Sequence, residues 1–528
     1  MRHNFGLLFA AFALVAGPIG ASGAAAQTDA SAFLSAADEA MGASRLNSLQ
    51  LSGAGWYGPL GQNFSPEEHW ARLNLESYDL AIDYNAGATR EELVVTQGDY
   101  PSRGGGFQPI VGERRTLSYL SGDDAWTANA DGEARAQPGQ AEVRQFLIAT
   151  SPHGFIKAAQ ESGNATIVQR YFVGTDRTIN VVGFTTMEKY RVTGEFDEEN
   201  RLERVISWIP DEVMGDMQYE IRYSDYRDIG DGIIFPYRFH AHRGDNFMLP
   251  TNSARNWMDY RVSEIQANVD IDIDVPANVS GAEPQPINVV ATEVADGVWH
   301  MTGSNAHSVA IEFRDFITVV EAPSSDARST AVIAEIKRVI PNKPIRYLVT
   351  THHHFDHIGG VRNYVAEGST VVTHEANEVF FNRVVFATQS RVLNPDRLHL
   401  FPFATTGPAP FRLETMTDRH AISDGERTLM LFHLTGIDHA ATMLVPYLPA
   451  EKILIHADLY SPPPAGGPAP ARIRDREIAL YRAVQRWGLD VETHVPIHGR
   501  TGPNSDFERI VGPAAMQQAD AAGGGGGG

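Results

Sequence analysis

A group of side chains suited to holding a metal ion lies in the second half of the chain. Residues 350–360 read Thr-Thr-His-His-His-Phe-Asp-His-Ile-Gly-Gly, which places His352, His354, Asp356 and His357 within six residues. They follow the apolar run 345–350, whose length and composition predict a buried strand. Two histidines two residues apart project the same way from an extended segment. Imidazole together with carboxylate favours Zn²⁺, with Fe or Mn as alternatives.

Three later segments each bring a further histidine or aspartate beside an apolar run. They are Gly436-Ile-Asp-His439, Lys452-Ile-Leu-Ile-His-Ala-Asp458 and Val495-Pro-Ile-His498-Gly. With the His-x-His-x-Asp-His string at 352–357, these segments resemble, in order, the metal-binding segments of the metallo-β-lactamase superfamily. The resemblance covers about residues 290–512.

The resemblance implies a dinuclear centre and its ligands. His352, His354 and His439 would hold the first metal ion, and Asp356, His357 and His498 the second. Asp458 would bridge the two ions. One departure lies at Glu321-Ala-Pro, where the family often has an acidic Asp-x-Gly turn, so the residues that support the ligands are expected to differ.

Two divalent ions this close together would share a water and lower its pKa from about 16 towards 7. The resulting bridging hydroxide would attack a carbonyl carbon or phosphorus, while one ion stabilises the oxygen that becomes negative. Asp356 is also a candidate catalytic residue, because its carboxylate could orient the hydroxide and pass its proton to the leaving group. The resemblance therefore implies a metal-dependent hydrolase of an ester, lactone, thioester or related carbonyl compound.

Other functions stay open. A β-lactam substrate is an alternative, although the familiar β-lactamases carry Cys or Ser where this chain has the bridging type of aspartate, Asp458. A phosphodiester substrate and an oxygen-reducing di-iron centre are further alternatives. A different class of protein, a binder of hydrophobic ligands with an auxiliary metal site, would make the N-terminal half the main functional part.

Candidate contacts to a small or apolar substrate lie on loops near the ligand segments. His307 is on the loop between the first two strands of the C-terminal half, and Phe403 and Tyr460 belong to Pro/Gly-rich loops. Loops that flank catalytic residues commonly carry the binding residues. We therefore expect these three side chains to contact the substrate.

The elements that position these residues are predicted from the hydrophobic pattern. Strands are expected at 298–301, 308–313 and 317–321, followed by an amphipathic helix at 326–339 and the buried strand at 345–350. This order is typical of layered α/β architecture. The family resemblance implies a four-layer αββα domain over residues 286–512.

The N-terminal half has a different rhythm. After a helix at 30–41, alternating runs such as 71–80, 92–96, 189–196 and 218–223 predict strands, interrupted by helical residues at 141–160. Alternation favours antiparallel sheets with one buried face, so residues 28–285 are expected to form a β-rich half-barrel. The hairpin near 197–202 and its neighbours resemble bacterial lipoprotein-carrier half-barrels. His240 and His242 have no ligand-like partners nearby in sequence.

The ends of the chain and its composition bear on location and partners. Residues 1–26, with a basic start, an apolar run and Ala24-Ala25-Ala26, are typical of a cleaved signal peptide, which predicts a periplasmic or secreted protein. No later segment suits a membrane span. The net charge of -22 disfavours nucleic acid as a partner, and the absence of cysteine excludes disulfides and thiolate ligands. Residues 513–528 are expected to be a disordered Ala/Gly tail.

Overall fold

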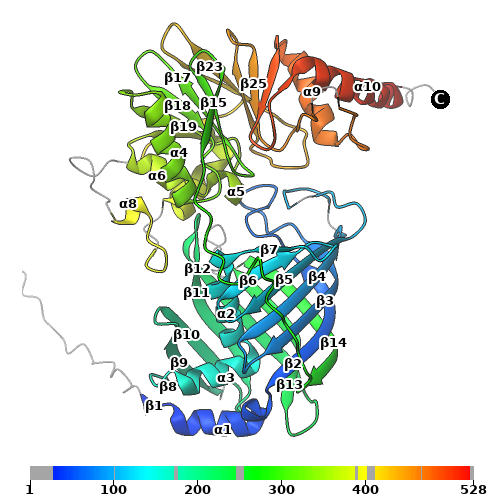
Figure 1. The fold of residues 1–528 in the computed structure, drawn as a ribbon, viewed down its shortest axis with the longest axis vertical. Helices are drawn as coiled ribbons and strands as arrows, with labels where there is room; N and C mark the ends of the chain where they lie inside the picture. The colour runs from blue at the N-terminus through cyan, green and yellow to red at the C-terminus, as the bar shows by residue number, and fades with distance from the viewer. Residues whose placement is uncertain are drawn as a thin grey trace, which may run out of the picture.

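The computed structural model describes residues 28–99, 101–106, 108–171, 177–244, 255–386, 391–400, 411–464 and 467–523. The predicted signal peptide at 1–26 and the candidate substrate contact Phe403 lie outside the described residues. Figure 1 shows two parts arranged end to end along the long axis, with the C-terminal half on one end of a large N-terminal sheet.

The N-terminal part is a single antiparallel sheet of 14 strands in the order β1-β8-β9-β10-β11-β12-β13-β14-β2-β3-β4-β5-β6-β7. Two meanders, β2–β7 and β8–β14, are joined where β14 pairs with β2. The strands are β1 Thr28–Asp29, β2 Ser48–Tyr57, β3 Leu73–Asp83, β4 Ala88–Thr96, β5 Arg114–Ser121, β6 Asp124–Ala128, β7 Ala134–Ala136, β8 Thr166–Tyr171, β9 Thr178–Thr186, β10 Tyr190–Phe196, β11 Leu202–Asp211, β12 Gly215–Asp228, β13 Ile234–Arg243 and β14 Arg255–Ala267.

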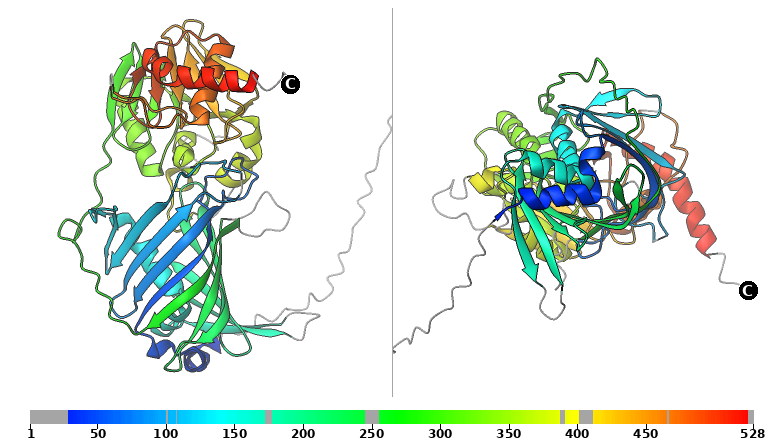
Figure 2. Two further views of the ribbon diagram at one scale, coloured as in Figure 1. Left: turned by 90° about the vertical axis from the view of Figure 1, so that its right-hand side faces the viewer. Right: turned by 90° about the horizontal axis from the view of Figure 1, so that it is seen from below.

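This sheet curves around helices, as the alternating sequence predicted. Figures 1 and 2 show it wrapped around α2 (Ala141–Thr150) and α3 (Pro152–Glu161). Phe146 of α2 and Phe155 of α3 are fully buried against the inner face. Helix α1 (Ser31–Met41) packs near α3, where the sequence placed a helix.

The hollow of the sheet contains a mostly apolar cavity of about 120 Å³ between the inner face and the two helices. Tyr78, Tyr223 and Trp257 are among its lining residues. Glu91 is the acidic group in the lining, and the Tyr78 hydroxyl donates a hydrogen bond of 2.8 Å to it. Burial raises the pKa of Glu91.

The C-terminal part contains two sheets. The first has seven strands in the order β15 to β21, antiparallel up to β18 and parallel from β18 to β21. The second has six strands, β22 to β27. The strands are β15 Val290–Ala295, β16 Val298–Thr302, β17 Ser308–Glu312, β18 Ile317–Val320, β19 Ile345–Val349, β20 Thr370–His374, β21 Leu413–Met416, β22 Arg419–Ser423, β23 Thr428–His433, β24 Leu444–Leu448, β25 Ile453–His456, β26 Thr493–Pro496 and β27 Gly502–Pro503.

The two sheets pack face to face, and helices cover their outer faces, so this part has four layers. Leu348 and Val349 are neighbours on β19, yet Leu348 belongs to the core under the helices and Val349 to the core between the sheets. On β25, Ile453 faces the core between the sheets, whereas Leu454 packs in the core beside α9 and α10. Both faces of each sheet are therefore covered, which is the αββα arrangement that the family resemblance implied.

The helices of this part are α4 Asp326–Val339, α5 Phe355–Ile358, α6 Val361–Ala366, α7 Glu378–Phe380, α8 Arg397–Leu400, α9 Asp475–Trp487 and α10 Asn504–Gly523. Helix α4 occupies the predicted residues. The expectation of a disordered tail from residue 513 is wrong for 513–523, because α10 continues through Pro513 and buries Ala515. Among the described residues, no helix has both the length and the apolar content needed to cross a bilayer.

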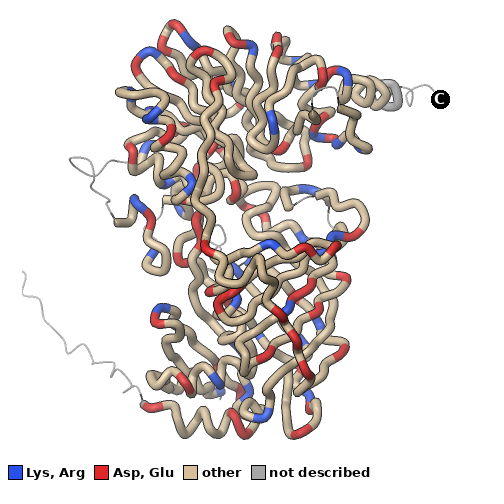
Figure 3. Tube along the Cα trace, in the orientation of Figure 1, with Lys and Arg blue, Asp and Glu red and all other residues tan. Residues whose placement is uncertain are grey.

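Charged residues of both signs are interspersed over both parts of the molecule, as Figure 3 shows. Residues 268–289, which connect β14 to β15, contain turns but no helix or strand. This connection includes the polar, Pro-bearing stretch at which the sequence placed the domain boundary.

Candidate metal centre

The predicted ligands converge from four segments at one edge of the two C-terminal sheets. His352 and His354 follow β19, Asp458 follows β25 and His498 follows β26. Asp356 and His357 stand in α5, the short helix after β19, and His439 is on the loop between β23 and β24. Because the carboxyl ends of parallel strands meet at one edge of a sheet, ligands that are far apart in the sequence form one cluster.

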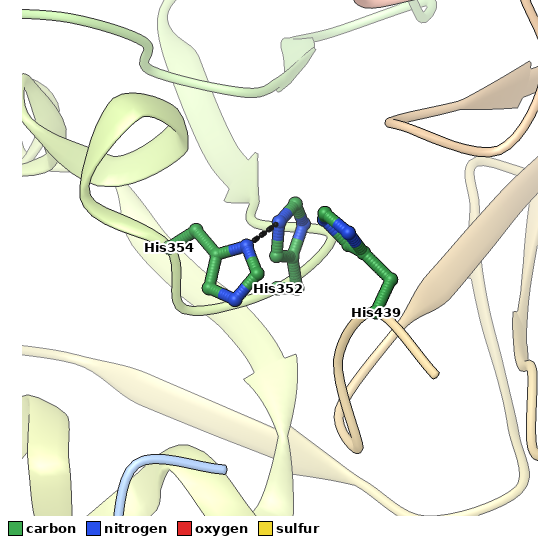
Figure 4. A group of neighbouring side chains, drawn as sticks. All are labelled: His352, His354 and His439. Carbon is green, nitrogen blue, oxygen red and sulfur yellow. Dashed lines mark hydrogen bonds between the residues drawn. The ribbon is translucent and has the colours of Figure 1, made fainter. Parts of the chain in front are cut away.

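Three histidines form the first ligand group, shown in Figure 4. His352 Nε2 lies 3.0 Å from His354 Nδ1, and the ring centroids of His354 and His439 are 4.7 Å apart. One nitrogen from each of the three rings falls within 4.8 Å of the others. The three rings come from two different loops and point toward one another.

The second group contains Asp356, His357 and His498, whose ligand atoms also lie within 4.8 Å of one another. His357 Nε2 and His498 Nε2 are 3.1 Å apart. Asp458 lies between the two groups: its Oδ2 atom is 2.8 Å from His357 Nε2, 3.4 Å from His439 Nε2 and 3.5 Å from His352 Nε2. This central position is the one expected of a bridging carboxylate.

The side chains fit a pair of divalent cations. His439 Nε2 and Asp458 Oδ2 are buried atoms without a hydrogen-bond partner among the described residues. Leaving buried polar atoms unpaired is costly, so both atoms are explained most simply as ligands. Imidazole nitrogens with carboxylate oxygens, and no thiolate, form a donor set that suits Zn²⁺.

Glu321 holds His357 in the orientation that a ligand needs. Its Oε2 atom accepts a hydrogen bond of 2.6 Å from His357 Nδ1, and its Oε1 atom accepts one of 2.5 Å from the Thr351 amide. Glu321 is fully buried, and its φ of 72° is unusual for a residue other than glycine. The residue at which the chain departs from the family turn therefore supplies the supporting carboxylate.

The second nitrogens of the other histidines are anchored differently. His354 Nε2 lies 2.9 Å from the Asn63 carbonyl, and His498 Nδ1 lies 2.7 Å from the Asn305 carbonyl. Each of these rings thus donates its outer N–H to a backbone oxygen, which leaves the inner nitrogen free to bind metal. At His439 the neighbour of the outer nitrogen is a cation, since Arg476 Nη1 lies 3.0 Å from Nδ1.

A loop from the N-terminal part reaches into this site, which the sequence did not predict. Gln62 Nε2 donates a hydrogen bond of 2.8 Å to Asp356 Oδ1. The Asn63 carbonyl contacts both His353 and His354. A Cβ atom at Gly105 would lie 2.9 Å from His354 Cε1. The loop that contains Gly105, the second N-terminal loop at this site, therefore approaches the same ligand closely. The sequence carries little signal for this contact beyond the Gly104–Gly106 run.

The electrostatics of the cluster favour charged carboxylates, and they favour neutral imidazoles at His352 and His354 but not at His357. Although burial opposes it, Asp458, Asp356 and Glu321 raise the pKa of His357 well above 6.5. Burial raises the pKa of Asp356, but His357, His354 and the hydrogen bond from Gln62 together outweigh it, so the pKa is lowered overall. The same balance, with His357 and His439 opposing burial, holds the pKa of Asp458 well below its ordinary value. Burial and then the neighbouring rings hold the pKa of His352 well below 6.5. Ionised carboxylates and neutral imidazoles are the states in which such groups bind metal, and His357 would release a proton on binding.

The candidate substrate contacts are placed less favourably. Tyr460 is only 3% exposed, and its ring packs against Phe507 with centroids 4.7 Å apart, so this placement does not support substrate contact. His307 is also buried, with its ring against His300 and its Nε2 atom 3.0 Å from the Ser304 carbonyl. Phe403 lies outside the described residues.

Comparison with known proteins agrees with this architecture. Residues 303–498 match the model of the Metallo-beta-lactamase superfamily. This span contains every predicted ligand.

Two curated proteins are similar over part of their length. A linear primary-alkylsulfatase from Pseudomonas sp. (strain ATCC 19151) is 27% identical over 227 residues, which cover 38% of this chain and 42% of that protein. The 2,4-dinitroanisole O-demethylase subunit alpha from Nocardioides sp. (strain JS1661) is 24% identical over 242 residues, 45% of this chain and 66% of that protein. The chain thus spans less than two thirds of the length of either relative.

Solved structures with similarity include a metallo-β-lactamase from Pontibacter korlensis, 20% identical with a TM-score of 0.31, which covers 44% of this chain and 99% of that chain. Another is the metallo-β-lactamase FIM-1 from Pseudomonas aeruginosa in a mono-zinc form, 23% identical with a TM-score of 0.31, covering 44% of this chain and 100% of that chain.

Proposed function

We propose that this domain of the metallo-β-lactamase superfamily is the catalytic part of a dinuclear, Zn²⁺-dependent hydrolase of carboxylic esters, lactones or thioesters. One observation carries the proposal: Asp458 Oδ2 lies within 2.8–3.5 Å of His357, His439 and His352, which belong to both ligand groups. A carboxylate in that position links two ions into one centre.

In the bound state, two such ions would activate water at neutral pH and stabilise the negative oxygen of the transition state. The protein residues supply orientation. Gln62 holds Oδ1 of Asp356, which leaves Oδ2 facing His357 at 3.5 Å and His498 at 3.9 Å. Asp356 is 48% exposed, so it is the ligand best placed to accept a proton and pass it to a leaving group.

The test is a hydrolysis screen with metal analysis on the same samples. Full-length protein supplemented with Zn²⁺ is expected to hold at least two ions per chain and to hydrolyse aryl esters, lactones or thioesters. A β-lactam is the substrate alternative, and a primary alkyl sulfate belongs in the screen because of the alkylsulfatase relative. One ion or none per chain would contradict the dinuclear centre. Two ions without hydrolysis of any carbonyl substrate would contradict the substrate class.

A second candidate function is supported by the cavity in the N-terminal sheet. A largely apolar space with one acidic group in its lining, Glu91, is suited to a hydrophobic ligand with a polar end. In this alternative the protein binds such a ligand, and the metal site is auxiliary. Tight binding of a fluorescent fatty acid by protein that lacks esterase activity even with two ions bound would favour it.

We also propose that the protein is exported to the periplasm or secreted. The basic, apolar and small-residue segments of residues 1–26 support this proposal. Mass spectrometry of protein from the native host is expected to show a mature chain that begins at Gln27. A chain that retains Met1 would contradict export by this signal.

A further inference from the structure

Two histidines stand side by side on the outer face of the N-terminal sheet, far along the chain from the metal centre. His240 and His242 alternate on β13 with Phe239 and Ala241, which are buried in the core. Residues two apart on a strand share a face, so both imidazoles project from the opposite, outer side. Their side chains are 27% and 15% exposed.

A carboxylate from each neighbouring strand anchors one nitrogen of each ring. Asp259 of β14 lies directly opposite His240, with its Oδ2 atom 2.8 Å from His240 Nδ1. Glu220 of β12 lies opposite His242, with its Oε1 atom 3.2 Å from His242 Nδ1. Both carboxylates approach the Nδ1 side, which is the arrangement that fixes the tautomer of a metal-binding histidine.

Guanidinium groups contact both carboxylates. Arg204 and Arg222 contact Glu220 at 2.6 and 2.7 Å, and Arg238 contacts Asp259 at 3.1 Å. Although burial raises the pKa of Glu220, hydrogen bonds from His242 and these two arginines lower it to about 2. An ionised carboxylate can only accept, so each histidine carries its proton on Nδ1.

The other two nitrogens consequently face each other with lone pairs. His240 Nε2 and His242 Nε2 are 3.0 Å apart, and the side-chain oxygen of Asn256 is 3.1 Å from His240 Nε2. The register shift between Ala241 and His242 places Asn256 opposite His242, so that Asn256 and Asp259, three residues apart, both reach the histidine pair. Bulges commonly redirect a side chain in this way.

We propose that His240, His242 and Asn256 hold a divalent transition-metal ion of the Zn²⁺ or Cu²⁺ class, separate from the catalytic centre. With the proton of each ring on Nδ1, three electron-pair donors converge, and neutral imidazole is a preferred ligand of both ions. The partial exposure of the two rings leaves room for water to complete the coordination. The ion would tie β13 to β14.

The competing explanation is a single proton shared by the two rings. Burial and then the adjacent His242 lower the pKa of His240, and Asp259 opposes them only in part. The lowered pKa disfavours a lasting imidazolium at His240. The three guanidinium groups oppose any added positive charge, so the affinity is expected to be lower than that of the catalytic centre.

The test measures Zn²⁺ stoichiometry in full-length protein by equilibrium dialysis and elemental analysis. His240→Gln and His242→Gln are each expected to hold one ion per chain fewer than the wild-type protein. The matched control is His420→Gln, because His420 also pairs with a carboxylate, Glu414 at 3.2 Å. This control is expected to bind as many ions as the wild type.

A third variant separates ligand loss from misfolding. Asp259→Asn keeps both imidazoles but removes the anchor of His240, and it is expected to weaken binding of the additional ion by about 10–100-fold. Equal stoichiometry in wild type and both histidine variants would overturn the proposal and favour the shared proton. The comparison is a difference of one ion, so it holds whether the catalytic centre binds one ion or two.

Discussion

Asp458 is the residue on which both ligand groups depend. Its carboxylate is 18% exposed and lies beside three histidines, and its backbone adopts a φ of 57°, which L residues other than asparagine and aspartate rarely adopt. This left-handed backbone, which an aspartate tolerates, places a largely buried charge that needs a partner. Two divalent ions would be that partner.

Asp458→Ala is expected to lower kcat/KM by at least about 100-fold, because it removes the bridge and unbalances the charge of the ligands. The matched control is Glu375→Ala, since Glu375 is exposed and follows another ligand-side strand, β20. The measurement is ester hydrolysis with metal content determined in parallel. Comparable losses in the two variants would show that the bridging assignment is misplaced.

Glu321 provides a second test at the residue scale. Glu321→Gln keeps the size of the side chain but no longer offers a carboxylate to His357 Nδ1, so binding of the second ion is expected to weaken by about 10–100-fold. Competition with a coloured chelator measures that affinity. An unchanged affinity would mean that His357 needs no support from Glu321.

His153 predicts a pH dependence of stability that is separate from catalysis. It is fully buried, its Nε2 atom is 3.0 Å from the Met41 carbonyl, and burial lowers its pKa to about 4. The unfolded chain takes up this proton near pH 6.5, whereas the folded chain does so near pH 4. The unfolding free energy is therefore expected to fall as the pH drops through this window, by on the order of 3 kcal/mol.

Urea titrations between pH 7 and pH 4 measure this effect. His153→Gln keeps a donor for the Met41 carbonyl but does not titrate, so the variant is expected to lose less stability across the window. A variant that follows the wild-type curve throughout would assign the pH dependence to other groups.

At the scale of elements, the loop between β2 and β3 holds Asp356 through Gln62. Gln62 lies between Asp356 and the second N-terminal loop, since its Oε1 atom accepts from the Gly106 amide at 2.8 Å. Gln62→Ala is expected to lower kcat about 10-fold with a smaller change in KM, because it releases Asp356 from its orientation. Gln97→Ala is the control, since Gln97 bonds Gln108 within the N-terminal part.

The sequence predicted the elements well where periodicity was local, and helix α4 has the predicted bounds. The candidate ligands at 352–357 could be proposed from the sequence because their spacing is compact, and the structure brings them together. The contact of Gln62 with Asp356 was not predicted, since 294 residues separate them and neither position has a pattern that points to the other. Helix α10 beyond residue 513 was missed because Pro and small residues there resemble a tail, whereas packing buries Ala515.

At the scale of the whole molecule, the structure changes the expected role of the N-terminal part. Every candidate ligand is C-terminal, which by itself would let hydrolysis of a small ester survive removal of residues 28–285. The structure instead gives that domain the carbonyl that anchors His354 and the amide that holds Asp356. Removal is therefore expected to lower kcat/KM on short and long esters alike.

The measurement compares full-length and truncated proteins on an acetate and a long-chain ester, with metal content checked for both. The truncated protein is expected to be slow even on the acetate, because it lacks the Asn63 carbonyl that contacts His354 and the Gln62 amide that contacts Asp356. A truncated protein that retains full activity on the acetate would contradict a role of these loops in the site.

The reach of the N-terminal loops into the metal centre has a consequence for how the chain can change over generations. Gly61 contacts Phe355, and Gly105 leaves no space for a side chain next to His354. If the C-terminal domain were exchanged at residues 268–289 for that of a distant homologue, the new domain would bring its own ligands. The N-terminal loops that contact them would no longer match. The two halves are therefore expected to evolve together, and substitutions near 61–63 and 104–106 are expected to covary with those near 353–356.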